Sequence, residues 1–201
     1  MRRILFIVAG LSVFSHNAWA QSWEEPRLRQ GVYLGGTLAG SLGGALEKHV
    51  HNAYLLPAGS LLLHVGEIIE RWGGLGFFVH ASGGGTQHNR FLIDTGLGFE
   101  SQILWRDTWI FTPMLGFSFH QSKTNTHENI QTGYGPLVGF QVGYACFEKA
   151  QLSQSGGFVV SPTIGLMYSP VTTLSTVEFF VGIDLRYYKG LDKMRLQGEP
   201  R

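Results

Sequence analysis

Hydrophobic and polar residues alternate one by one along most of the chain after residue 30. The clearest stretch runs from Phe91 to Leu104. One face of this stretch collects Phe91, Ile93, Thr95, Leu97, Phe99 and Ile103, and the other collects Leu92, Asp94, Gly96, Gly98, Glu100 and Gln102. A period of two places successive side chains on opposite sides of an extended backbone. The pattern therefore predicts a β-strand with one apolar face.

The same alternation recurs in further segments of similar length. The predicted strands are 30–39, 60–71, 74–82, 91–104, 109–120, 136–145, 160–168 and 177–188. Loops are expected near 40–59, 83–89, 121–133 and 169–175, alternating with connections at 71–73, 106–107 and 148–157. An even number of strands, with long loops at one end and mostly short turns at the other, is typical of transmembrane barrels. We predict an all-β fold, an eight-stranded antiparallel up-and-down transmembrane β-barrel.

The two faces of the strands differ in a way that fixes which one points outward. The apolar face is aliphatic in the middle of the strands. Aromatic residues stand near both ends of that face: Trp105, Trp109 and Tyr187, with Trp72 and Phe147 close by, at one end, and Phe91, Phe119, Tyr134 and Tyr168 at the other. Two aromatic girdles around an aliphatic band match the two membrane interfaces. The face with small and charged residues is therefore expected inside.

The segment 60–71 fits the pattern least well. Leu61, Leu63 and Val65 begin an outward face, but Glu67 then falls on it. One extra residue in a strand reverses the parity that follows. A bulge near Gly66 is therefore expected to return Ile68 to the outward face.

The ends of the chain and its composition set the wider context. Arg2 and Arg3, an apolar run and a small-residue exit at Ala18-Trp19-Ala20 predict a secretory signal peptide over residues 1–20. We expect a short periplasmic segment at 21–29, the barrel at 30–190 and a flexible periplasmic tail at 191–201. Cys146 is the one cysteine, so an internal disulfide is excluded. Without residues 1–20 the formal charge falls from +1 to about −1, which gives no reason to expect nucleic acid as a partner.

The last predicted strand carries the most specific resemblance to a known family. Phe180-Val181-Gly182-Ile183-Asp184-Leu185-Arg186-Tyr187 is similar to the final-strand signal of outer-membrane proteins, with Gly182, Leu185 and Tyr187 in the matching positions. Phe180 replaces the polar first residue of that signal, and a tail follows where the signal usually ends the chain. The chain resembles small outer-membrane barrels of the OmpA, OmpX and OmpW type. The resemblance implies a location in the cell outer membrane and recognition by the barrel-assembly machinery during biogenesis.

Several charged residues fall on the predicted inside face. The set is Glu70, Asp94, Glu100, Glu178, Asp184 and Arg186. An eight-stranded barrel has an interior just wide enough for side chains to fill. We interpret the set as a plug of hydrogen bonds and ion pairs rather than a path for ions. Buried carboxylates are costly unless they are paired or protonated, and Arg186 is the one firm cation on that face.

Histidines gather toward the predicted long-loop end: His49, His51, His88, His120 and His127. With Glu128 they offer donors for Zn²⁺ or Cu²⁺ if the loops converge. Loops collect polar residues anyway, and a spacing spread over several loops is no metal motif. We therefore expect neither a metal site nor a cofactor.

The pair His80 and Ser82 is the sharpest enzymatic feature. Lipid A deacylases of the PagL type are also eight-stranded barrels and carry a His-x-Ser pair beside a carboxylate. By that resemblance, Asp94 or Glu100 would orient His80 as the base and Ser82 would be the nucleophile. Gly83 replaces the Asn that follows the serine in that family, and parity directs both side chains inward rather than toward lipid. We therefore expect no catalytic site.

The function expected from these patterns is non-enzymatic. The barrel would act through its surface loops or as a structural part of the membrane, in integrity, adhesion or contact with lipopolysaccharide. The expected partners are outer-membrane lipid and lipopolysaccharide. Residues 46–56 of the first loop are apolar enough for a short helix or strand extension, which makes this loop the favoured binding element. The alternatives are a lipid A-modifying enzyme and a narrow transporter of small hydrophobic molecules.

Overall fold

The computed structural model describes residues 31–47, 52–70, 73–85, 90–105, 108–124, 127–150, 156–171 and 174–189. They form antiparallel strands in one continuous sheet. The strands are β1 (Gly31–Glu47), β2 (Asn52–Glu70), β3 (Gly73–Gly85), β4 (Arg90–Trp105), β5 (Trp109–Thr124), β6 (His127–Tyr144), β7 (Phe147–Ala150), β8 (Gly156–Pro170) and β9 (Leu174–Lys189). The described residues contain no helix long and apolar enough to cross a membrane.

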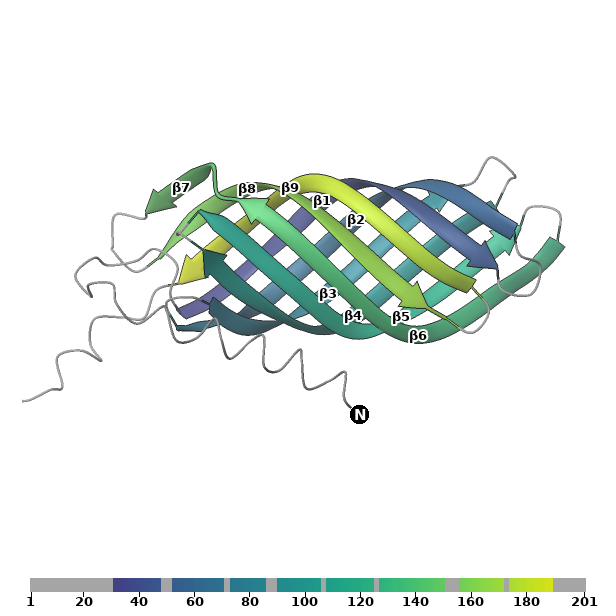
Figure 1. Ribbon diagram of the computed structural model, residues 1–201, viewed down its shortest axis with the longest axis horizontal. Helices are drawn as coiled ribbons and strands as arrows, with labels where there is room; N and C mark the ends of the chain where they lie inside the picture. Colours follow the sequence, from purple (N-terminus) through teal and green to yellow (C-terminus); the bar gives the residue numbers. More distant parts are fainter. Residues whose placement is uncertain are drawn as a thin grey trace, which may run out of the picture.

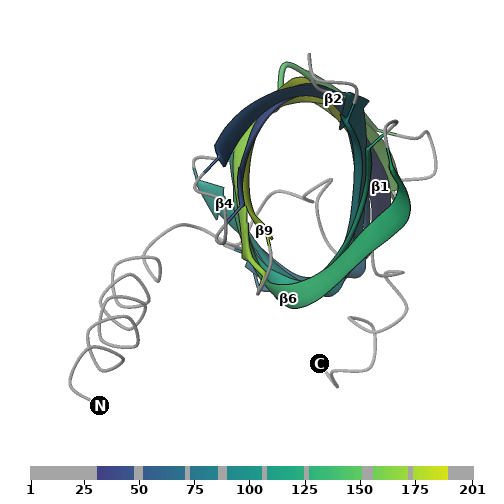
Figure 2. The ribbon, with the colours of Figure 1, turned by 90° about the vertical axis from the view of Figure 1, so that its right-hand side faces the viewer.

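Eight of these strands close into a barrel. Each pairs with the next along the chain, β9 pairs back with β1, and β6 pairs with β8. Figure 1 shows the strands crossing the long axis obliquely, and Figure 2 shows the closed ring from its end. The short β7 pairs with the first part of β8, directly beyond the end of β6. The prediction of an eight-stranded antiparallel barrel is confirmed.

The two ends of the barrel differ in what they carry. We call the end where β1 begins and β9 ends the turn end, and the opposite end the loop end. Both ends of the barrel segment, Gly31 and Lys189, lie at the turn end. Four hairpins, β1–β2, β3–β4, β5–β6 and β8–β9, reverse direction at the loop end.

Strands fill most of the segments that were predicted to be long loops. β1 and β2 stay paired as far as Glu47 and Asn52, so the predicted loop at 40–59 is mainly a hairpin, and β5 and β6 similarly occupy much of 121–133. Gly40, Gly43 and Gly44 have no side chains, so alternation is invisible there although the backbone continues its ladder. At the turn end, β7 occupies part of the predicted connection at 148–157.

The prediction of a bulge near Gly66 is wrong. β2 keeps its register with β3 through Ile68, and the irregularity falls between Ile68 and Glu70. Glu67 is exposed on the outer face, whereas Ile68 is 3% exposed and points inside. Glu67 lies near the turn-end rim of β2, where a charged side chain reaches the polar interface more easily than at the middle of a bilayer.

The outer face is apolar along the barrel wall. Leu38, Leu97 and Phe99 expose 72%, 65% and 66% of their surfaces, as expected for side chains that meet lipid. The polar exception in β4 is Ser101, whose hydroxyl donates a hydrogen bond of 3.1 Å to the carbonyl oxygen of Gly74. Aromatic side chains stand outward near both ends of the wall: Trp105 and Trp109 near the turn end, and Phe91, Phe119, Tyr134 and Tyr168 toward the loop end.

Candidate functional site

The barrel interior is filled by four layers that alternate between apolar and polar. The first layer closes the turn end with side chains from six strands: Tyr33, Ile68, Leu104, Ile110, Val159 and Tyr188. The rings of Tyr33 and Tyr188 lie 5.9 Å apart. Their hydroxyl groups reach the next layer, where Tyr33 donates to Glu100 at 2.8 Å and Tyr188 donates to Gln102 at 3.1 Å.

The second layer, which we call the inner polar layer, is a network around Glu100, Asp184 and Arg186. His64 Nδ1 lies 2.6 Å from the second oxygen of Glu100. Thr37 donates to Asp184 Oδ1 at 3.0 Å, and Arg186 Nε lies 2.6 Å from Asp184 Oδ2. The Arg186–Asp184 contact is a buried ion pair. Every carboxylate oxygen of this layer therefore has a polar neighbour.

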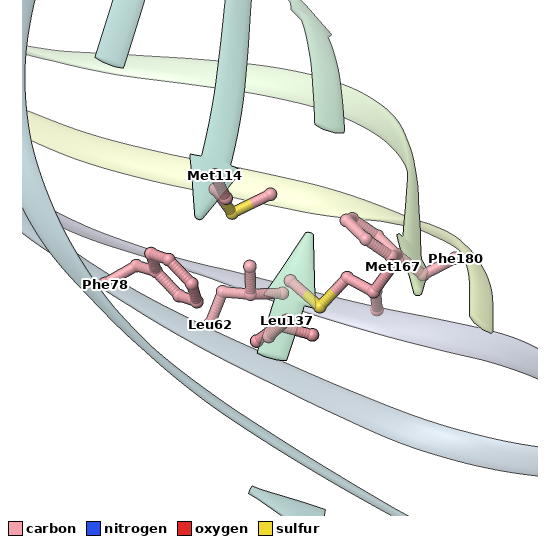
Figure 3. Packing of buried hydrophobic residues seen from close by; sticks show 7 residues of the cluster. Leu62, Phe78, Met114, Leu137, Met167 and Phe180 are labelled. Atoms are coloured by element: carbon pink, nitrogen blue, oxygen red, sulfur yellow. The ribbon is translucent and has the colours of Figure 1, made fainter. Parts of the chain in front are cut away.

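The third layer is an apolar plug across the middle of the barrel. Its members come from seven strands: Ala39, Leu62, Phe78, Met114, Leu137, Met167 and Phe180. Figure 3 shows the labelled side chains pointing toward one another in the interior. All of them are at most 7% exposed. This plug separates the inner polar layer from the polar groups nearer the loop end.

Glycines make room for the largest interior side chains. A Cβ at Gly35 would lie 2.6 Å from Arg186 Cγ, and a Cβ at Gly165 would collide with the ring of Phe180. A barrel of this size has no spare volume, so each large side chain requires a small residue on a neighbouring strand. This explains why the inside face predicted from the sequence is so rich in glycine.

The fourth layer, the mouth polar layer, lies beneath the loop end. His80 Nε2 is 3.2 Å from Ser60 Oγ and 3.4 Å from Glu178 Oε2. On the other side, His120 Nε2 is 2.9 Å from Ser118 Oγ, and its Nδ1 is 3.3 Å from Asp94 Oδ2. Ser169 bonds to both Ser118 and His120, and Thr176 donates to Asp94 Oδ2 at 3.4 Å. The layer thus holds two imidazoles and two carboxylates.

A pocket lies above part of this layer. Its lining comes from β1, β2, β3, β4 and β9: Gly43, Gly44, Ala58, Ser82, Gly84, Leu92, Asp94, Thr176, Val177 and Glu178. Half of the lining residues are glycine, alanine or serine, whose small side chains leave space open. Asp94 and Glu178 contribute its charged groups. They are only 5% and 7% exposed, and Asp94 Oδ1 and Glu178 Oε1 have no hydrogen-bond partner.

The structure places most of the charged residues of the predicted inside face within the barrel, but in two separate groups. Glu100, Asp184 and Arg186 belong to the inner polar layer, while Asp94 and Glu178 belong to the mouth polar layer. The backbone of Glu70 pairs with Gly73, and its side chain lies outside the described residues. Arg186 reaches its own strand neighbour Asp184 rather than a carboxylate across strands.

His80 and Ser82 do not form a catalytic pair in this structure. His80 Nε2 contacts Ser60 and Glu178, and its Nδ1 has no hydrogen-bond partner. Ser82 lines the pocket and faces the interior, and Asp94 contacts His120 rather than His80. Among the described residues, His80 therefore makes no hydrogen bond to the Ser82 hydroxyl of the kind that activates a serine nucleophile.

Of the five histidines grouped toward the loop end in the sequence, the structure describes the side chain of His120 alone. His120 points into the barrel, while His49, His51 and His88 and the side chain of His127 lie outside the described residues. Across the described part of the chain, no group of three or more His, Cys, Asp or Glu side chains is arranged to hold a metal.

Sequence reasoning did not assign a role to His64, which is 1% exposed and lies 2.6 Å from Glu100 in the inner polar layer. The available sequence signal was its position two residues after Leu62 in β2, which places both side chains on the same, inward face. The sequence analysis named Arg186 as the one firm cation for the inside carboxylates. In the structure, the buried His64, His80 and His120 also contact these carboxylates.

Three elements of the predicted assembly signal lie on β9. Leu185 is exposed on the outer face, and the ring of Tyr187 packs 4.9 Å from that of Phe158. A Cβ at Gly182 would lie 2.6 Å from the Cβ of Ala39, so the glycine permits close packing with β1. Recognition of this strand by the assembly machinery stays a prediction.

Comparison with known proteins supports the fold through structure alone. No protein-family model matches the chain. No curated protein matches its sequence.

Several solved structures are similar. One is Ail, the attachment invasion locus protein of Yersinia pestis, at a TM-score of 0.57 and 9% identity, covering 78% of this chain and 99% of Ail. Ail in complex with the heparin analogue sucrose octasulfate gives a TM-score of 0.55 and 8% identity over 78% and 99% of the two chains. Neisserial surface protein A has a TM-score of 0.49 and 11% sequence identity, covering 78% of this chain and 96% of its own. The chain has the fold of the small eight-stranded outer-membrane β-barrel proteins.

Proposed function

We propose that this protein is a non-enzymatic β-barrel of the bacterial outer membrane that acts through its loop-end hairpins or as a structural part of the membrane. The observation that carries the proposal is the filled interior. Two apolar layers cross the barrel, one at the turn end and one in the middle, and each consists of nearly fully buried side chains. An interior filled in this way leaves the outer wall and the rim as the surfaces on which the protein can act.

The outer wall supports a membrane location. Its exposed side chains are apolar around the barrel, with aromatic residues toward both ends. An apolar surface of that extent on a closed barrel fits lipid rather than water. The fold it shares with Ail supports the outer membrane in particular.

The β5–β6 hairpin is the favoured element for surface contacts, in place of the first loop favoured by the sequence. β6 pairs with β5 from His127 to Tyr144 but with β8 only from Val138 to Gly143. In Figure 1 this hairpin extends beyond the neighbouring strands at the loop end. Pro136 and Pro170 stand where the β6–β8 ladder stops, and proline has no N–H to continue such a ladder.

A planar-bilayer conductance measurement on the purified protein tests the filled interior. We expect no channel openings at any applied voltage, with a known porin as the positive control. Steady or voltage-gated openings would contradict a non-conducting barrel and favour the transporter alternative.

Lipid A from cells that make the protein tests the enzymatic alternative. Mass spectrometry should show unchanged acylation with the protein and with its Ser82→Ala variant. Loss of an acyl chain that depends on Ser82 would instead establish a deacylase.

A cell-based comparison separates the two branches of the proposal. In cells lacking the protein, we would measure detergent sensitivity and adhesion, then restore either the full chain or a variant whose residues 122–131 are replaced by a two-residue turn that joins the paired residues Gln121 and Thr132. Rescue of detergent resistance by both forms supports a structural role. Rescue of adhesion by the full chain alone supports action through the β5–β6 hairpin. If neither phenotype depends on the protein, the proposal is wrong.

A further inference from the structure

The pocket at the loop end has two carboxylate oxygens that make no close hydrogen bond in the described structure, although the hydroxyls of Ser41 and Ser82 lie near Glu178. Asp94 and Glu178 are both more than nine-tenths buried, both line the pocket, and each has one oxygen without a hydrogen-bond partner. A buried charged group without a partner carries a large desolvation penalty. We propose that this pocket binds a primary ammonium group that enters from the loop end.

The polar groups around the pocket are mainly hydrogen-bond acceptors. Besides Asp94 Oδ1 and Glu178 Oε1, the nearby His80 Nδ1 and Ser41 Oγ have no partner. His80 with its proton on Nε2 offers the lone pair of Nδ1 as an acceptor, while the hydroxyl of Ser41 can accept as well as donate. An ammonium group supplies three N–H donors and one positive charge, so it can bond to both carboxylate oxygens and to one further acceptor.

The excess of unpartnered hydrogen-bond acceptors is found in the mouth polar layer and not in the inner polar layer. In the inner polar layer both oxygens of Glu100 and of Asp184 have polar contacts, and the unpartnered atoms include donors, Arg186 Nη1 and Nη2 and Gln102 Nε2. One interior thus contains a layer with surplus donors and a layer with surplus acceptors. The middle apolar plug keeps them apart, so the mouth polar layer requires its cation from outside.

The composition of the pocket favours an ammonium over a metal ion. Across the described residues no three His, Cys, Asp or Glu side chains converge as metal ligands. Divalent cations require six or more oxygen ligands or several strong side-chain ligands. The wall of Gly43, Ala58 and Gly84 has no bulk to block a slender alkyl chain behind the ammonium group.

The test is a site-resolved NMR titration of the full chain in zwitterionic micelles, with methylammonium and 1,4-diaminobutane as probes. We expect saturable shifts of the backbone amides of Ser82, Asp94 and Thr176, and none at His64 or Asp184. Tetramethylammonium has the charge but no N–H donors, so it should cause no saturable shift at these positions.

Variants decide whether the carboxylates and the pocket are responsible. The double change Asp94→Asn and Glu178→Gln should weaken methylammonium binding about tenfold to a hundredfold, the range expected for lost hydrogen bonds to a charged group. Ala58→Leu keeps both charges but fills the pocket, and should abolish binding of the diamine. Glu100→Gln, in the inner polar layer, is the matched control and should leave binding unchanged.

Folding of each variant is checked by its heat-modifiable migration on a gel. Equal shifts with tetramethylammonium, unchanged binding in the double variant, or saturable shifts with CaCl₂ but not with amines would each overturn the ammonium site. Binding by diaminobutane but not methylammonium would also contradict it, because the second amine would then be the determinant.

Discussion

The two polar layers inside the barrel are built from similar residues and are satisfied differently. In the inner polar layer, His64, Tyr33, Thr37 and Arg186 contact all four carboxylate oxygens of Glu100 and Asp184. In the mouth polar layer, His80, His120 and Thr176 leave one oxygen each of Asp94 and Glu178 without a partner.

The difference follows from where each layer lies. The inner polar layer is closed above and below by apolar side chains, so its charges must be balanced by the chain itself. The mouth polar layer borders a pocket at the loop end, where solvent ions or a ligand can complete it. Buried charge therefore serves as structure in one layer and as a potential binding surface in the other.

The largest expected effect comes from removing the boundary between the layers. Phe180 is fully buried in the middle apolar plug and packs over Gly165. Phe180→Ala should lower the free energy of unfolding by about 4 kcal/mol, because it leaves a cavity that rigid strands cannot close. Urea unfolding in lipid vesicles, followed by tryptophan fluorescence, measures it. The outward-facing Phe179→Ala is the control on the same strand, and equal losses would contradict the plug.

Disrupting the inner polar layer should lower the free energy of unfolding by somewhat less than Phe180→Ala does. Asp184→Ala leaves Arg186 buried beside fewer negative charges, and we expect a loss of about 3 kcal/mol. The same unfolding assay applies, with Glu67→Ala on the outer face as the carboxylate control. A loss below that of the control would show that Arg186 does not depend on Asp184.

Two of the three histidines that face carboxylates offer a direct contrast. His64 Nδ1 lies 2.6 Å from Glu100, whereas His80 Nε2 lies 3.4 Å from Glu178 beside the pocket. His64→Ala should destabilise by about 2 kcal/mol and His80→Ala by about 1 kcal/mol, because water can replace the second side chain more easily. The reverse order in paired unfolding curves would remove the distinction between the layers.

The smallest effect is expected from neutralising the mouth polar layer. Without an added amine, Asp94→Asn with Glu178→Gln should change stability by no more than about 1 kcal/mol, because the lost contacts to His80 and His120 offset the removal of two incompletely paired buried charges. The double variant is compared with the original chain in amine-free buffer. A loss comparable to that of Asp184→Ala would mean that the mouth carboxylates are structural.

The fold could be predicted because the alternation of apolar and polar residues was clear wherever the side chains were large. In β4, the alternation from Phe91 to Leu104 assigned the outward and inward residues as the structure has them. It failed at Gly40, Gly43 and Gly44, where strands without side chains were mistaken for a loop. It also placed the β2 irregularity at Gly66 rather than after Ile68, because bulges depend on pairing with the neighbouring strand.

The candidate site could be predicted only in part from the sequence. Alternation along the strands placed Asp94, Glu100 and Glu178 inside the barrel. It did not give their depth along the barrel axis, so the two polar layers were predicted as a single network. The depth of a residue depends on strand tilt and on register between strands, and neither is encoded in a single segment. The apolar plug was equally hidden, although Phe78, Met114 and Phe180 all had inward parity.

The migration of the purified protein on a gel before and after boiling tests the membrane barrel most directly. A closed barrel with lipid-facing walls should resist unfolding by detergent at room temperature, so that unboiled and boiled samples run at different positions. It should also require detergent or lipid to remain in solution. Identical migration of the two samples, together with solubility in plain buffer, would contradict the membrane barrel and the layered interior derived from it.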